Sequence, residues 1–158
     1  MQYAAGSVQR VIPFRLSPGE DVFACLMEIC EREQVSAGVV LTCVGSLDGV
    51  SFCDIEVLPE KKCGCGYGRV YSWDGLFELL SVSGIVGRDA DGKVNLHLHY
   101  TFADREGRVF GGHMVEGNRV KMTVEGAIGA FDGVTMVISF RKEGNTNDED
   151  FADQRNEP

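Results

Sequence analysis

Through most of the chain, apolar and polar residues alternate with the period of two that is typical of β-strands, and short polar turns interrupt this alternation. Several turns contain an Asp-Gly or Glu-Gly pair, which favours tight connections between antiparallel strands over crossover helices. The pattern predicts strands at residues 9–16, 37–44, 50–58, 66–73, 76–83, 94–102, 109–115, 120–128 and 134–141.

One segment near the N-terminus follows a helical pattern instead. Ser17-Pro18-Gly19-Glu20 combines a capping serine, a proline at the first helical position and a glutamate three residues after the cap, which together indicate a helix start. Apolar residues then recur at spacings of three and four until about Gln34, and such a stripe covers a sheet. We therefore predict an α+β fold: a strongly bent antiparallel sheet or partly closed barrel with one main covering helix.

Length and charge limit the class of protein. The chain of 158 residues is long enough for one domain with its own core, and we place this domain at residues 1–143. Residues 144–158 are acidic and lack apolar periodicity, which predicts a disordered tail. The formal net charge of −9 has the wrong sign for holding a phosphate backbone, so direct binding to nucleic acid is not expected.

The cysteines and the absence of a targeting pattern bear on the compartment. Residues 1–10 do not read as a signal peptide and no apolar run reaches membrane length, so we expect a cytoplasmic protein that does not enter membranes. Cys25, Cys30 and Cys43 lie in apolar stretches and are expected to act as small buried hydrophobes. Cys63-Gly64-Cys65 could bind a metal or form a redox pair, but it has no matching second pair, and a glycine-rich hairpin tip is the favoured interpretation.

The three histidines of the chain lie close together in sequence, as His97-Leu98-His99 and then His113 after a glycine pair. On a strand, His97 and His99 project from the same face. If residues 103–109 close an antiparallel hairpin, residues whose numbers sum to about 212 lie opposite each other, and His99 faces His113. Three neutral imidazoles with one open position are typical of a reactive or ligand-exchanging zinc site. The alternative is that His97 and His99 are strand residues hydrogen-bonded in a polar cleft, and that His113 merely follows a glycine pair.

Several segments occur in an order that resembles a known family, the plant and prokaryote conserved (PPC) domain. The resemblance spans about residues 8–142 and rests on the segments Arg15-Leu16-Ser17-Pro18-Gly19-Glu20-Asp21-Val22, Ser36-Ala37-Gly38-Val39-Val40, Gly45-Ser46-Leu47, Gly75-Leu76-Phe77-Glu78-Leu79-Leu80-Ser81-Val82-Ser83-Gly84, His97-Leu98-His99 and Gly111-Gly112-His113.

This resemblance implies a homotrimer with a metal ion, most plausibly zinc, at His97, His99 and His113, and a fold similar to that of the zinc enzyme acetolactate decarboxylase. Stand-alone members of the family are often labelled DNA-binding, and related domains follow AT-hooks in plant nuclear proteins. Here no AT-hook motif is present, and Leu76 stands where plant members typically carry arginine, which puts partner recognition through residues 77–84 in doubt.

Three functions follow from these observations. The first is a metal-binding, trimeric module that binds a small molecule or acts in regulation. The second is a zinc-dependent lyase or hydrolase acting on a small oxo acid, with Glu78 or Glu125 in proton transfer and Arg15 holding a substrate carboxylate. Each of these residues could equally be a solvent-facing strand residue, with Arg15 paired to Glu20 or Asp21. The third is a DNA-binding regulator, which the charge opposes.

Overall fold

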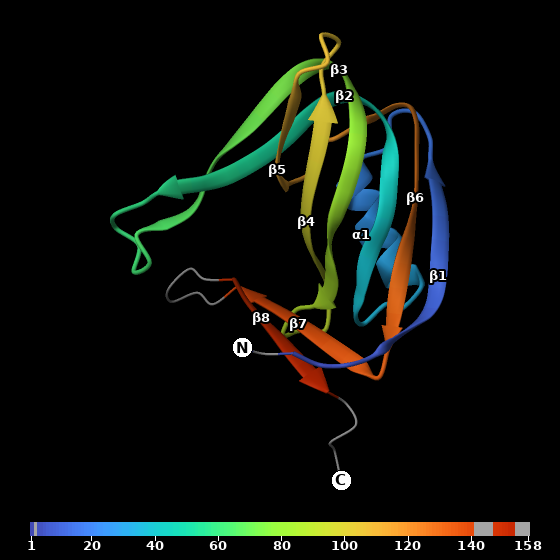
Figure 1. The fold of residues 1–158 in the computed structure, drawn as a ribbon, viewed down its shortest axis with the longest axis vertical. Coiled ribbons are helices and arrows are strands. Elements are labelled where there is room, and N and C mark those ends of the chain that lie inside the picture. Colours follow the sequence, from blue (N-terminus) through green and yellow to red (C-terminus); the bar gives the residue numbers. More distant parts are fainter. Residues whose placement is uncertain (2, 141–146, 154–158) are drawn as a thin grey trace.

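The computed structural model describes residue 1, residues 3–140 and residues 147–153. In this described part, one helix accompanies eight strands (Figure 1): β1 (Ser7–Leu16), α1 (Val22–Arg32), β2 (Gly38–Val57), β3 (Cys65–Arg88), β4 (Val94–Ala103), β5 (Val109–Met114), β6 (Val120–Asp132), β7 (Val134–Phe140) and β8 (Asn147–Asp153).

The strands form one strongly bent sheet in the order β1-β6-β2-β5-β4-β3-β7-β8. Strand β2 also pairs with β3, so that β2, β5, β4 and β3 close on one another as a ring while the remaining strands continue from it. The predicted bent, largely antiparallel sheet with one covering helix is confirmed. The α+β class overstates the helical share, because the described residues contain a single helix of 11 residues, and the fold is dominated by the sheet.

Two strand boundaries were predicted wrongly. The strands predicted at residues 37–44 and 50–58 are parts of the single strand β2, apart from their end residues 37 and 58, and residues 66–73 and 76–83 belong to β3. The ladder pairs Asp48 with Leu76 and then Val50 with Trp73, so Gly49 faces the Asp74-Gly75 pair across a β-bulge. A bulge bends the ribbon without ending it. Because glycine at positive φ is favoured both in bulges and in turns, the sequence pattern does not distinguish the two. Beyond this bulge the β2–β3 ribbon extends away from the rest of the sheet (Figure 1).

The helix begins later than its sequence predicts. Asp21 is the N-cap, and its Oδ1 accepts a hydrogen bond from the Ala24 amide at 2.9 Å. The predicted cap Ser17 instead starts a turn, in which its amide donates to Glu20 Oε2 at 2.6 Å. The helix ends at Arg32, two residues before the predicted end, and buries one stripe against the inner surface of the sheet: Val22, Leu26 and Cys30.

The C-terminal acidic segment is described in part. Residues 147–153 form β8, which pairs antiparallel with β7, whereas the sequence predicts no regular structure there. The other residues of the segment 144–158 lie outside the described residues. Among the residues described, no helix combines the length and the apolar character needed to cross a bilayer.

Candidate metal site

Strand β4 presents two histidines on one face. Along this strand buried residues alternate with more accessible ones, and the buried set includes Leu96, Leu98 and Tyr100. His97 and His99 therefore project from the opposite face, as the period of two requires. The buried leucines fix the orientation of the strand, because turning it over would expose them to water.

The β4–β5 hairpin brings the third histidine to the same place. The register pairs His99 with His113, which confirms the predicted alignment. The turn that sets this register is held by Asp104, whose Oδ1 accepts hydrogen bonds from the amides of Glu106 and Arg108 at 3.0 and 2.9 Å. Gly107 lies within this turn at φ 79°, a conformation that glycine adopts without strain.

The glycine pair before His113 has a packing role. A Cβ at Gly111 would lie 2.5 Å from the carbonyl oxygen of Tyr100, and one at Gly112 would lie 2.9 Å from the Phe52 ring. Only residues without a side chain allow β5 to pack this closely between β4 and β2. The same close approach lets β2 pair with β5 at His113 and closes the ring of strands.

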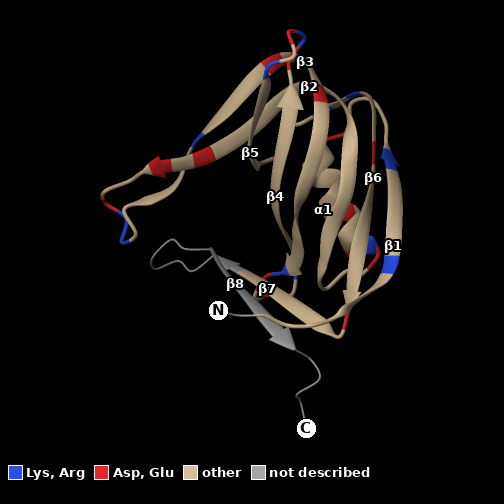
Figure 2. Ribbon diagram, in the orientation of Figure 1, with Lys and Arg blue, Asp and Glu red and all other residues tan. Residues whose placement is uncertain are grey.

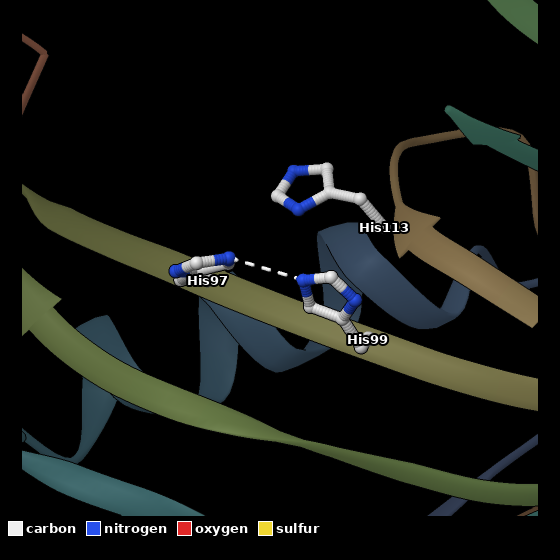
Figure 3. Close-up of side chains that lie close together, drawn as sticks. All are labelled: His97, His99 and His113. Atoms are coloured by element: carbon white, nitrogen blue, oxygen red, sulfur yellow. Dashed lines mark hydrogen bonds between the residues drawn. The ribbon is translucent and has the colours of Figure 1, made fainter. Parts of the chain in front are cut away.

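The three imidazoles face one another (Figure 3). Their ring centroids lie 5.2 to 5.3 Å apart, and one nitrogen from each ring lies within 4.8 Å of the others. Nε2 of His97 is 3.1 Å from Nε2 of His99. Within the described residues, this is the group of three His, Cys, Asp or Glu side chains whose donor atoms could hold one metal ion.

The protonation state of the site suits a cation. Burial, followed by the neighbouring charges of His97 and His99, lowers the pKa of His113 to about 4. Burial also lowers the pKa of His99, and the charge of His97 adds to this effect. Nδ1 of His113 is buried and has no hydrogen-bond partner among the described residues, although a buried ring nitrogen normally has one. A metal ion would satisfy this nitrogen, so the residues fit the group.

We expect the stability of the metal-free protein to rise with pH between about 4 and 6.5. In this window the unfolded chain protonates His113 and the folded chain does not, so protons favour unfolding. The full shift corresponds to about 3 kcal/mol, which partial solvent access lowers to about 1 or 2 kcal/mol. Urea unfolding with chelator present, in wild type and in His113→Gln, measures the difference. An equal pH dependence in both proteins would contradict the expectation.

Tyr67 of β3 also reaches the triad, although no sequence pattern predicts this contact. Its hydroxyl lies 3.2 Å from Nε2 of His97, and its ring packs over His113 with centroids 4.2 Å apart. The alternation of apolar and polar residues does not predict that Tyr67 contacts the histidines, because this contact depends on how the β2–β3 ribbon bends.

A second residue of this ribbon, Asp54 of β2, acts on the triad through its charge, which favours the protonated form of His99.

The three predicted acid, base and anchor residues lie elsewhere in the chain. Arg15 and Glu125 face each other on β1 and β6, where they form an exposed ion pair at 3.5 Å. Glu78 is exposed on β3 and pairs with Ala103. The β3 residue that pairs with His99 is Ser83, five residues further along the strand, and five strand residues span about 16 Å. Within one chain, none of the three is brought to the histidines, and Arg15 pairs with Glu125 rather than with Glu20 or Asp21.

Residues 63–65 lie at the tip of the β2–β3 ribbon, so the predicted hairpin tip is confirmed. The Leu58 amide donates to the Gly64 carbonyl at 2.9 Å, and Gly64 has a positive φ of 71°. Sγ of Cys63 donates a hydrogen bond to the carbonyl oxygen of Cys65 at 2.9 Å. Cys30 and Cys43 are buried as predicted, whereas Cys25 is only partly buried.

A small, ring-forming sheet with a three-histidine site on one hairpin defines the class of this protein, and comparison with known proteins gives its family. The sequence profile of the Plants and Prokaryotes Conserved (PCC) domain matches residues 3–132. The chain belongs to this family, and the resemblance inferred from its motifs is confirmed. The bifunctional protein GlmU of Synechococcus sp. (strain JA-3-3Ab) is 32% identical to this chain over 116 residues, covering 73% of it. The chain spans only 16% of that protein's length.

Solved structures show the same fold. A PPC protein of Pyrococcus horikoshii has a TM-score of 0.76 at 27% identity, covering 93% of this chain and 96% of that one. A metal-containing protein of Archaeoglobus fulgidus has a TM-score of 0.79 at 20% identity, covering 94% and 99%. A protein of Bacteroides thetaiotaomicron whose name suggests DNA binding has a TM-score of 0.74 at 12% identity, covering 96% and 98%. For the Archaeoglobus fulgidus and Bacteroides thetaiotaomicron proteins, at 20% and 12% identity, the likeness concerns the fold alone.

Proposed function

We propose that this protein is a cytoplasmic, zinc-binding homotrimer that binds a small molecule or acts as a regulatory module. The observation that carries the proposal is the convergence of His97, His99 and His113, with donor nitrogens within 4.8 Å of one another and an unsatisfied Nδ1 on His113. The protein of Archaeoglobus fulgidus that shares this fold is described as metal-containing, which supports the same interpretation.

The chain's residues would hold the ion as neutral imidazoles. Since the pKa values of His99 and His113 are lowered, cation binding displaces little proton from them at neutral pH. A bound zinc ion supplies a Lewis acid that can take a carboxylate or carbonyl oxygen. Elemental analysis of the purified protein, loaded with zinc and passed through a desalting column, tests the proposal. We expect about one zinc per chain, and a content near zero would refute it.

The outer surface of the sheet supports self-association. Strands β2, β3 and β6 carry exposed apolar side chains, at positions where alternation turns them away from the core: Leu41, Val44, Leu76, Leu80 and Met122. Leu80 is 41% exposed, whereas its neighbour Leu79 is 1% exposed. Exposed apolar side chains gathered on neighbouring strands mark an interface more often than a solvent face.

We expect Leu80→Glu to convert the trimer to monomer, because a buried, unpaired carboxylate at a subunit interface is costly. Light scattering after size exclusion measures the mass. Val8→Glu, on β1 and with a similar exposure of 50%, is the matched control and should stay trimeric. A wild-type protein that runs as a monomer would refute the assembly.

The enzymatic alternative rests on the accessible triad and on the expected likeness to acetolactate decarboxylase. It needs an acid or base near the metal, and Glu78, Glu125 and Arg15 would have to come from another subunit. Screening small oxo and hydroxy acids with zinc-loaded protein separates the two functions. Turnover that disappears on zinc removal favours the enzyme, and saturable binding without turnover favours the regulatory module.

We expect no tight binding to DNA. The chain carries 15 Lys and Arg against 24 Asp and Glu, and in Figure 2 the basic positions of the described residues are spread over several strands and loops rather than gathered on one element. Without a basic surface there is little counterion release to drive association. A fluorescence anisotropy titration with duplex DNA at two salt concentrations measures this. Tight binding that weakens steeply with added salt would contradict the expectation.

A further inference from the structure

The bend of the β2–β3 ribbon gives the histidine site a fourth side chain. Tyr67 lies beyond the bulge at Gly49, on the part of β3 that pairs with Ile55 of β2. From there its ring is half-buried against His113, at a centroid distance of 4.2 Å and an interplanar angle of 34°. The phenol is therefore held against the site by packing as well as by its hydroxyl.

The distances around His97 match those within a tetrahedral metal site. Ligands at about 2.0 to 2.1 Å from a tetrahedral zinc lie about 3.3 Å from one another. Nε2 of His97 is 3.1 Å from Nε2 of His99 and 3.2 Å from the Tyr67 hydroxyl oxygen. Both separations are close to one tetrahedral edge, so the hydroxyl lies at the distance from His97 that a neighbouring ligand would have.

We propose that the Tyr67 oxygen is the fourth ligand of the metal. The inference rests on the proposed function, since it assumes a divalent cation at the three histidines. As the oxygen–metal bond forms, the phenol releases its proton to solvent, and the resulting anionic oxygen resembles in charge the carboxylate oxygens that zinc accepts. A carboxylate ligand would then displace Tyr67 or bind as a fifth ligand beside it.

Ultraviolet difference spectroscopy tests this inference, because zinc itself is spectrally silent and a coordinated phenolate is not. We expect zinc added to the metal-free protein to produce the absorption of one ionised phenol per bound zinc. Tyr67→Phe should lose this absorption and bind zinc about tenfold more weakly. The matched control is Tyr71→Phe, on the same ribbon, whose hydroxyl contacts Glu56 at 3.4 Å rather than a histidine. It should keep both the absorption and the affinity.

The outcomes separate the inference from the proposed function. One bound zinc without a phenolate signal, or a signal that persists in Tyr67→Phe, overturns the role of Tyr67 and leaves the histidine site in place. A weaker affinity in Tyr67→Phe with no signal in wild type identifies a hydrogen-bonding role of the hydroxyl, because phenylalanine keeps the ring, and also overturns the inference. Failure of wild type to bind zinc at all removes both.

Discussion

Replacing His97 or His113 with alanine is expected to weaken zinc binding by about 100-fold or more, because each variant removes one of three converging nitrogens. The chain has no other histidine that could substitute for the lost ligand. Competition with a chromophoric chelator measures the affinity, and elemental analysis after desalting gives the zinc content. We expect about one zinc per chain in wild type and almost none in either variant.

Thr101→Ala is the matched control for these variants. Thr101 follows His97 and His99 on the same face of β4, is exposed, and bonds to Ser81 at 2.9 Å rather than to the triad. Its removal should leave zinc binding unchanged. Circular dichroism of each variant checks that the fold persists, since His97 and His113 are only half-buried. Zinc retained at full stoichiometry and affinity in His113→Ala would show that the site uses other ligands.

The histidine hairpin could be predicted because its determinants are local. Alternation on β4 decides where His97 and His99 point, and the turn at Asp104 decides which residue faces His99. Both signals lie within a few residues of the site in sequence. The contact of Tyr67 is different, since it joins residues 30 apart through a bend that the sequence shows only as an Asp-Gly pair.

The position of the helix cap shows why other boundaries were missed. Ser17 and Asp21 are both residue types that cap helices, and local sequence favoured Ser17 with its following proline. Oδ2 of Asp21, however, also accepts hydrogen bonds from the amides of Gly117 and Asn118, at 2.7 and 2.8 Å. A contact across almost 100 residues thus selects the cap, and no pattern within one helical turn contains that information.

Gly84→Ala is expected to destabilise the fold by about 3 to 5 kcal/mol, because it places a side chain where two strands touch. Gly84 pairs with Leu98, between the two histidines of β4, and has a φ of 149°. A Cβ there would lie 2.1 Å from the carbonyl oxygen of His97 and 2.8 Å from Cα of Leu98. These are backbone atoms, so β4 itself must move, and we expect zinc affinity to fall together with the free energy of unfolding.

Gly92→Ala separates this steric effect from backbone freedom. Gly92 also has a positive φ, 78°, but nothing lies within 4 Å of the position of its Cβ. Alanine there should cost only about 1 kcal/mol and leave zinc binding intact. Urea unfolding of both variants gives the comparison. An equal loss in the two proteins would mean that glycine is needed at Gly84 for its backbone angle alone, and the close approach of β3 would then have no part in positioning His97.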